Sequence, residues 1–269
     1  MNYDSYYQLA NQPLLFVLAE FRFTEIMSID KYFPDIQDSL RQVFPLFEEQ
    51  TLQEINILPD GMQMNQSKQW AFIDKDKKNA VLLNHKRIVF ITSNYDRFDG
   101  FRKYCEIALE ALIAVAKPSL LTRIGLRYSN LILATDGDDI TQYVQSNVCN
   151  ESHLKGVGHP VRQINETVLE TDEGNMVIRS MYANTDVSIF QDLGNIPIKV
   201  ATQDQSSQRI LLDFDHFWQP NLDNESTDDS IDSLDFEKDI IIDKLEKIHK
   251  LNRQAFWDIT TDSGKEVWK

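Results

Sequence analysis

The chain has 269 residues, and its 42 acidic and 27 basic side chains give a formal charge of −15 at pH 7. Because 42% of the residues are apolar, the chain can bury a core and wholesale disorder is excluded, while no apolar run approaches the ~20 residues of a membrane-spanning helix. A pI near 4.7 argues against general attraction to nucleic-acid phosphates or to anionic lipid.

The first half of the chain predicts a strand, a helix, further strands and a long helix. Residues 14–23 are rich in aromatic and branched apolar side chains and follow Pro13, which favours a buried strand. Ser28 is expected to cap a helix that ends near Pro45, with a start or a kink at Pro34. Strands are predicted over 49–58, 70–74 and 80–92, the last split into a hairpin at 85–87, and an amphipathic helix runs from Phe98 to Lys117-Pro118.

The second half repeats this order of elements. A strand over 121–133 is followed by a short helix behind Asp138 and Asp139. Strands are then predicted over 161–170, 176–184, 197–201 and 208–214, before a long helix whose apolar stripe runs from Phe236 to Ala255. Short turns between the central strands require antiparallel order. The sequence therefore predicts an α+β protein in which antiparallel sheet is backed by two long helices.

The repeated order suggests a tandem duplication of a β-α-β-β-β-α unit. Phe21-Arg22-Phe23 resembles Leu126-Arg127-Tyr128, and Val89-Phe90-Ile91-Thr92 resembles Ile210-Leu211-Leu212-Asp213. Two unrelated halves of the same class would also produce such short echoes. We place the halves at 1–118 and 119–269 and expect them to pack as one unit. The sequence does not decide whether they form one sheet or two.

The densest polar cluster is Asp213, Asp215 and His216. On a strand the two aspartates point to one face and His216 to the other. Two carboxylates near an imidazole would suit acid–base chemistry or a divalent metal, so these three residues are the candidate catalytic group. The simpler interpretation, which we favour, is a strand end whose acids face water and whose Phe214 faces the core. No phosphate loop, dinucleotide-binding glycine pattern, zinc motif or nucleophile elbow occurs, so neither a cofactor nor a metal is predicted.

Three arginines lie within apolar strands, where an unpaired charge would be costly to bury: Arg22, Arg123 and Arg127. Arg123 and Arg127 share a strand face, on which Asn130 does not lie. One hypothesis is an anion-binding groove on the open face of the sheet, with these arginines and Asn130 as binding residues. The alternative, which we favour, pairs the arginines with glutamates of neighbouring strands, namely Glu20, Glu166 or Glu170.

Residues 223–239 concentrate negative charge, with eight acidic side chains against Lys238 alone. Calcium chelation, phosphate mimicry toward a basic partner and a regulatory role are the functional alternatives, and calcium is disfavoured because no DxDxDG loop occurs. We favour a solvated insertion whose last acids, Asp235 and Glu237, interact with the dipole of the following helix. The remainder of the chain is then only mildly acidic.

Several segments in order along the chain resemble one known family, a sporadically distributed group of uncharacterised bacterial proteins of similar length. The matching strand segments are Asn11-Gln12-Pro13-Leu14, Glu20-Phe21-Arg22-Phe23, Arg123-Ile124-Gly125-Leu126-Arg127-Tyr128-Ser129-Asn130 and Asp213-Phe214-Asp215-His216. The closing helix matches at Leu245, His249, Arg253, Ala255-Phe256 and Thr260, with Trp268 near the end. Residues 223–239 look longer and more acidic than the family's usual connection. The resemblance implies one full-length unit and an accessory role such as defence or toxin control, and it brings no activity, cofactor or catalytic residue.

Three classes of function follow from these features. We favour a non-catalytic binding or regulatory protein that recognises a protein partner through its sheet face or its acidic segment. The second hypothesis is an enzyme with a non-standard site built from Asp213, Asp215, His216 and Arg127. The third is nucleic-acid binding, which the overall charge opposes.

The compartment is predicted from the cysteines and the first residues. Cys105 and Cys149 are too few for a disulfide framework, and the N-terminus has neither a basic region nor a sustained apolar region of a signal peptide. We therefore expect a cytoplasmic protein that does not enter the membrane. The sequence predicts no particular oligomeric state.

Overall fold

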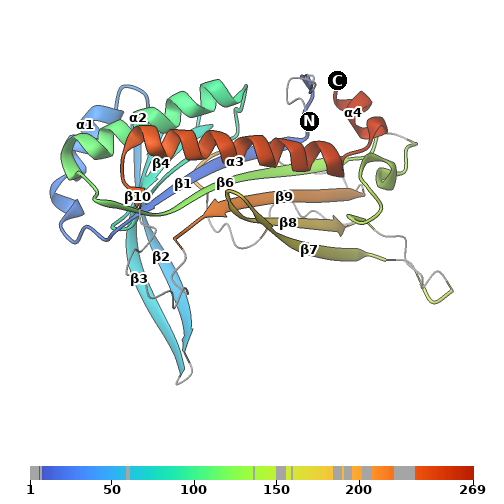
Figure 1. Cartoon of the computed structure of the whole chain (residues 1–269), viewed down its shortest axis with the longest axis horizontal. Coiled ribbons are helices and arrows are strands. Elements are labelled where there is room, and N and C mark those ends of the chain that lie inside the picture. Colours follow the sequence, from blue (N-terminus) through green and yellow to red (C-terminus); the bar gives the residue numbers. More distant parts are fainter. Residues whose placement is uncertain are drawn as a thin grey trace.

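The apolar strands of the chain assemble into one antiparallel sheet, and helices cover one of its faces (Figure 1). The computed structural model describes residues 6, 8–58, 61–135, 137–149, 156–158, 160–183, 190, 196–201, 208–220 and 234–269, with the backbone alone at 52–58 and 61–66. The α+β class, the antiparallel order and the two long helices that back the sheet are confirmed. Both halves of the chain contribute to the same sheet.

Most strands match the predicted segments. Their bounds are β1 Leu14–Phe23, β2 Leu46–Leu58, β3 Gly61–Ile73, β4 Asn79–Leu83, β5 Arg87–Thr92, β6 Leu120–Leu133, β7 Arg162–Thr171, β8 Gly174–Ala183, β9 Arg209–Trp218 and β10 Leu234–Asp235. However, β3 begins nine residues before the predicted segment 70–74, and β10 was not predicted. The helices are α1 Phe33–Leu40, α2 Phe98–Ala116, α3 Lys238–Ile259 and α4 Asp262–Trp268, with 3-10 turns at Ile29–Lys31 and Ile140–Tyr143.

The sheet is organised around the pair formed by β1 and β6, the opening strand of each half. The order across it is β2-β3-β4-β5-β1-β6-β9-β8-β7, with the short β10 pairing the first residues of β6. Outward from the centre, each half therefore adds its later strands in reverse chain order. The strands that carry the short sequence echoes, β1 with β6 and β5 with β9, occupy corresponding places. A common origin of the halves stays a prediction.

Two predicted details are wrong. Ser28 makes no side-chain hydrogen bond to a helix terminus, because the helix begins only at Phe33 with Pro34 in its first turn, where the missing N–H is tolerated. Residues 197–201 form no strand. Pro197 lacks a donor there, and Lys199 instead donates its backbone N–H to Lys77 in a turn of the first half.

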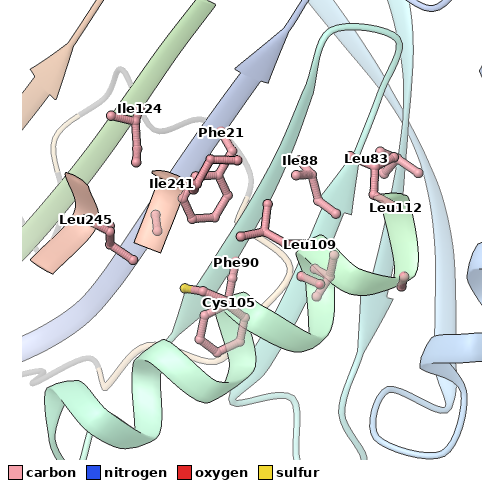
Figure 2. Packing of buried hydrophobic residues seen from close by; sticks show 14 of the residues in the cluster. Phe21, Leu83, Ile88, Phe90, Cys105, Leu109, Leu112, Ile124, Ile241 and Leu245 are labelled. Carbon is pink, nitrogen blue, oxygen red and sulfur yellow. The ribbon is translucent and has the colours of Figure 1, made fainter. Parts of the chain in front are cut away.

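The two faces of the sheet have different chemistry, because side chains alternate along each strand. We call the face that carries Phe21, Leu126 and Phe214 the helix face, and the face that carries Glu20, Arg127 and Asp213 the ion-pair face. Figure 2 shows the helix face at its centre, where side chains from the strands meet the apolar stripes of α2 and α3. The fully buried contacts include Phe21, Phe90, Cys105, Leu109, Ile124, Ile241 and Leu245.

The turn between β7 and β8 depends on Gly174, whose φ of +111° is disfavoured for residues with a side chain. A Cβ at this position would lie 2.2 Å from the backbone oxygen of Phe217. We therefore expect Gly174→Ala to lower the free energy of unfolding by about 2 kcal/mol or more, measured by urea denaturation. Gly100→Ala is the matched control, because nothing lies within 4 Å of its Cβ, and it should be neutral or stabilising. Equal stability of both variants would contradict this account of the turn.

Candidate functional site

The predicted arginines converge on a buried carboxylate of the ion-pair face. Glu20, whose side chain is 7% exposed, forms ion pairs with Arg22 at 2.9 Å, with Arg87 at 2.8 Å and with Arg123. Burial acts to raise the pKa of Glu20, but Arg123, Arg87 and Arg22 outweigh it, so the pKa of this carboxyl is lowered. Arg22 and Arg123 are thus the ladder partners of Glu20, as the sequence suggested, and Arg87 is a third partner that it did not reveal.

A second buried carboxylate lies two strands away. Asp213 is fully buried, and its two oxygens accept hydrogen bonds from Arg127 at 2.8 Å and from Arg179 at 3.0 Å. Burial raises the pKa of Asp213, and the two guanidinium groups act in the opposite direction. The expectation that this acid faces water is wrong, because β8 covers the outer side of β9 and brings Arg179 opposite Asp213. Asp215 lies on the same face, 3.8 Å from Arg123.

His216 points away from both aspartates, as strand alternation requires. It lies on the helix face, and its Nε2 is 3.0 Å from the Thr171 hydroxyl. Burial lowers the pKa of His216 to about 4, so the imidazole is neutral at pH 7. Asp213, Asp215 and Arg127 therefore share one face of the sheet, while His216 belongs to the other. The proposed catalytic group is not brought together as one site.

Asn130 also lies on the helix face, at the floor of a cleft. Its Nδ2 donates a hydrogen bond to the backbone oxygen of Leu212 at 3.0 Å. We call this hollow the helix-side cleft. It measures about 600 Å³, a size typical of small-molecule sites, and its walls are the N-terminus of α2, the second half of α3 and the N-terminal segment that includes Tyr6.

A chain of hydrogen bonds links three aromatic side chains of the helix-side cleft. The Tyr128 hydroxyl lies 2.8 Å from His249 Nδ1 and 3.5 Å from the Tyr95 hydroxyl. His249 stacks on Phe98 with ring centres 3.9 Å apart and planes within 1° of parallel. This stack fixes the imidazole between α2 and α3. Sequence reasoning missed the group, because its members come from a loop, a strand and two helices.

The imidazole of His249 and the phenols of Tyr95 and Tyr128 in the helix-side cleft are neutral at pH 7. Burial lowers the pKa of His249 to about 3, with the charges of Arg253 and Lys250 adding to the effect. Burial raises the pKa of Tyr95 to about 12 and holds that of Tyr128 well above its ordinary value. General acid–base catalysis needs a group that titrates near the working pH. The arrangement is therefore better suited to holding a molecule than to moving protons.

A third feature is the outer edge of the sheet at β7. Among the strands that the structure describes, β7 has a partner on one side alone, β8. Apolar side chains that are normally buried are exposed along it and just before it: Val161 (71%), Ile164 (51%), Val168 (59%) and Leu169 (42%). Native proteins usually blunt such edges, because unpaired N–H and C=O groups accept a further strand.

The acidic segment is described only in its last part. Residues 223–233 lie outside the described residues, and Asp235 belongs to β10, which pairs with Leu120. Glu237 precedes α3 without a side-chain hydrogen bond to it, and Asp239 is the acid in its first turn. Within the described ranges, no three or more His, Cys, Asp or Glu side chains are grouped as a metal site would require.

Comparisons with protein-family models, with curated proteins and with solved structures each return no match. The resemblance to the sporadically distributed bacterial family therefore stays a prediction. Of the helices in the described part of the chain, none is long and apolar enough to cross a bilayer.

Proposed function

We propose that the protein is a non-catalytic binding or regulatory protein that recognises a protein partner through the edge of β7. The observation that carries this proposal is the exposure of Ile164 and Val168 on a ten-residue strand at the end of the sheet. A partner segment that adds a strand gains main-chain hydrogen bonds from the edge and specificity from the alternating side chains. The family resemblance supports a role in a bacterial accessory system, such as defence or toxin control, in the cytoplasm.

The polar clusters support binding rather than catalysis. Glu20 and Asp213 are each enclosed by guanidinium groups, so neither carboxylate is placed to attack a substrate or to accept its proton. His216 and His249 have pKa values near 4 and 3, far below the pH at which a cytoplasmic general base would operate.

The side chains of β7 define the chemistry of the partner. Ile164, Glu166, Val168 and Glu170 alternate along the strand and project on the ion-pair face. A matching segment is extended, presents apolar side chains beside Ile164 and Val168, and carries lysine or arginine beside Glu166 and Glu170.

We test the proposal with a photo-cross-linking amino acid in place of Leu169, introduced in cells that carry the native neighbouring genes. The expected result is a defined adduct with one other protein. Adding Ile164→Lys and Val168→Lys should reduce its yield about tenfold, because charge on the edge opposes strand addition. Reversing the charge at Glu166 and Glu170 should weaken the adduct to a similar degree.

The controls separate the edge from the rest of the surface. The cross-linker at Met27, which is 86% exposed, should give no such adduct, and Val267→Lys on α4 should leave the yield from position 169 unchanged. An adduct with a second copy of this chain would show that the edge binds another copy of the same protein and not a different partner. Lack of any adduct, or one insensitive to the edge substitutions, would contradict the proposal.

A further inference from the structure

The helix-side cleft has the features of a ligand site that is separate from the β7 edge. Its floor is formed by Tyr128, Asn130 and Phe214 of the sheet, and its upper wall includes Asn252 and Trp257 of α3. A volume near 600 Å³ lies within the range of roughly 300–1,000 Å³ that is usual for small-molecule sites. The lining combines aromatic side chains with polar and charged ones, and polar groups placed among apolar walls orient the ligand in such sites.

Two asparagines of the cleft lining have amide oxygens that accept no hydrogen bond from a described residue. Asn252 donates its Nδ2 to the backbone oxygen of Leu126 at 3.2 Å, and Asn130 does the same to Leu212. A carbonyl oxygen only accepts hydrogen bonds, so each amide is oriented with its nitrogen toward the backbone and its Oδ1 elsewhere. Asn252 is 2% exposed, and among the described residues its buried Oδ1 has no hydrogen-bond partner. A buried acceptor of this kind is costly unless a donor reaches it.

The third polar group is the imidazole of His249. Its Nδ1 is engaged with the hydroxyl of Tyr128, and no hydrogen bond from its Nε2 to a described residue is present. When the Tyr128 hydroxyl donates to Nδ1, the neutral ring carries its proton on Nε2, which then acts as a donor. Two amide acceptors and one imidazole donor therefore belong to residues of the cleft lining.

The shape and charge of the walls narrow the class of ligand. The parallel stack of His249 on Phe98, together with Tyr6 and Trp257, forms flat surfaces suited to a planar molecule. Around the mouth, the two acids Asp96 and Asp99 balance Arg97 and Arg253. The site therefore has no excess positive charge for a phosphate or carboxylate.

We propose that the helix-side cleft binds an uncharged, planar nitrogen heterocycle whose amino or ring N–H groups donate to Asn252 and Asn130, the chemical class of nucleobases and nucleosides. The ring lies among the aromatic walls, and a ligand acceptor meets His249 Nε2. Such binding is independent of the β7 edge, which belongs to the far end of the sheet order.

The test uses the full chain and four probes: adenosine, guanosine, cytidine and uridine, titrated by calorimetry with Trp fluorescence as a second readout. At least one should bind with a dissociation constant below about 1 mM. The analogue of that nucleoside in which the donor N–H groups are methylated should bind about tenfold more weakly, since it leaves the asparagine acceptors unpaired. The 5′-monophosphate should bind no more tightly than the nucleoside.

Variants locate the site. Asn252→Ala and Trp257→Ala should each weaken binding about tenfold, whereas Asn165→Ala should not. Asn165 is a matched control, because it also donates its amide to a backbone oxygen, that of Val148 at 2.8 Å, yet lies outside the helix-side cleft. If Asn252→Ala does not fold, the methylated analogue still tests recognition of the N–H groups in the native protein.

The outcomes are distinct for the two proposals. No binding by any of the four nucleosides, or equal binding of the methylated analogue, would overturn the ligand assignment. The chain with Ile164→Lys and Val168→Lys should bind the nucleoside as the native chain does, so loss of the partner adduct and loss of ligand binding are separate results.

Discussion

Replacing Glu20 by glutamine is expected to lower the free energy of unfolding by about 3–5 kcal/mol at pH 7, because the substitution removes the one carboxylate around which three guanidinium groups gather. The side chain of Glu20 is 7% exposed and that of Arg123 is 15% exposed, so water screens the charge left at Arg123 weakly, whereas Arg22 at 46% and Arg87 at 29% reach solvent. Urea unfolding followed by circular dichroism measures the change.

A second substitution tests the electrostatic cause. Glu20→Gln combined with Arg123→Met should be less destabilising than Glu20→Gln alone, since it removes one of the mutually repelling cations. Asp258→Asn changes the same charge at an exposed position of α3 and should alter stability by less than about 0.5 kcal/mol. A loss below about 1 kcal/mol for Glu20→Gln would show that the cluster is solvated in solution.

Acidification from pH 7 to pH 5 is expected to destabilise the protein by about 4 kcal/mol through two histidines. The pKa of His216 is lowered to about 4 and that of His249 to about 3, from an ordinary value of 6.5. Below pH 6.5 the unfolded chain therefore binds protons that the folded chain does not. The stabilisation is complete above pH 6.5 and is lost as the pH falls toward the folded pKa values. Glu20, with its lowered pKa, adds to the loss only below about pH 4.5.

Histidine variants separate these contributions. His249→Phe keeps an aromatic ring against Phe98 and should remove about half of the difference in stability between pH 7 and pH 5. His216→Asn should remove the other half. Equal urea midpoints at the two pH values for the native chain would mean that the folded state accepts both protons, contrary to the burial of these rings.

Local sequence patterns were sufficient to predict most helices and strands of the fold. The stripe that begins at Phe98 predicts α2 almost to its last residue, and the turn at 85–87 separates β4 from β5 as expected. These features depend on neighbours in the sequence. The strand predicted over 197–201 is wrong because the branched apolar residues there favour a strand, whereas the structure of this segment is set by its contact with Lys77 in the other half.

The residues that meet in the candidate sites could not be predicted in full, because their contacts depend on the order of the strands in the sheet, which no local sequence pattern contains. Glu20 was a predicted partner for the arginines because charges on neighbouring strands commonly pair with charges of opposite sign. Arg179 was not predicted to pair with Asp213, since this contact requires β8 to lie against the outer side of β9. The helix-side cleft was still less accessible to prediction, because its polar groups come from Tyr95, Tyr128 and His249, whose elements meet only in the folded protein.

The central place of β1 has a consequence for synthesis on the ribosome. β1 pairs with β5 on one side and with β6 on the other, and 41 residues separate the end of β5 at Thr92 from the end of β6 at Leu133. At ~5–20 residues per second, roughly 2–8 s pass between the emergence of these two strands. During that interval a nascent first half would present β1 as a bare edge. The strand that is innermost in the finished protein is thus the one most in need of protection, by a chaperone or by the ribosome surface, while the chain is being made.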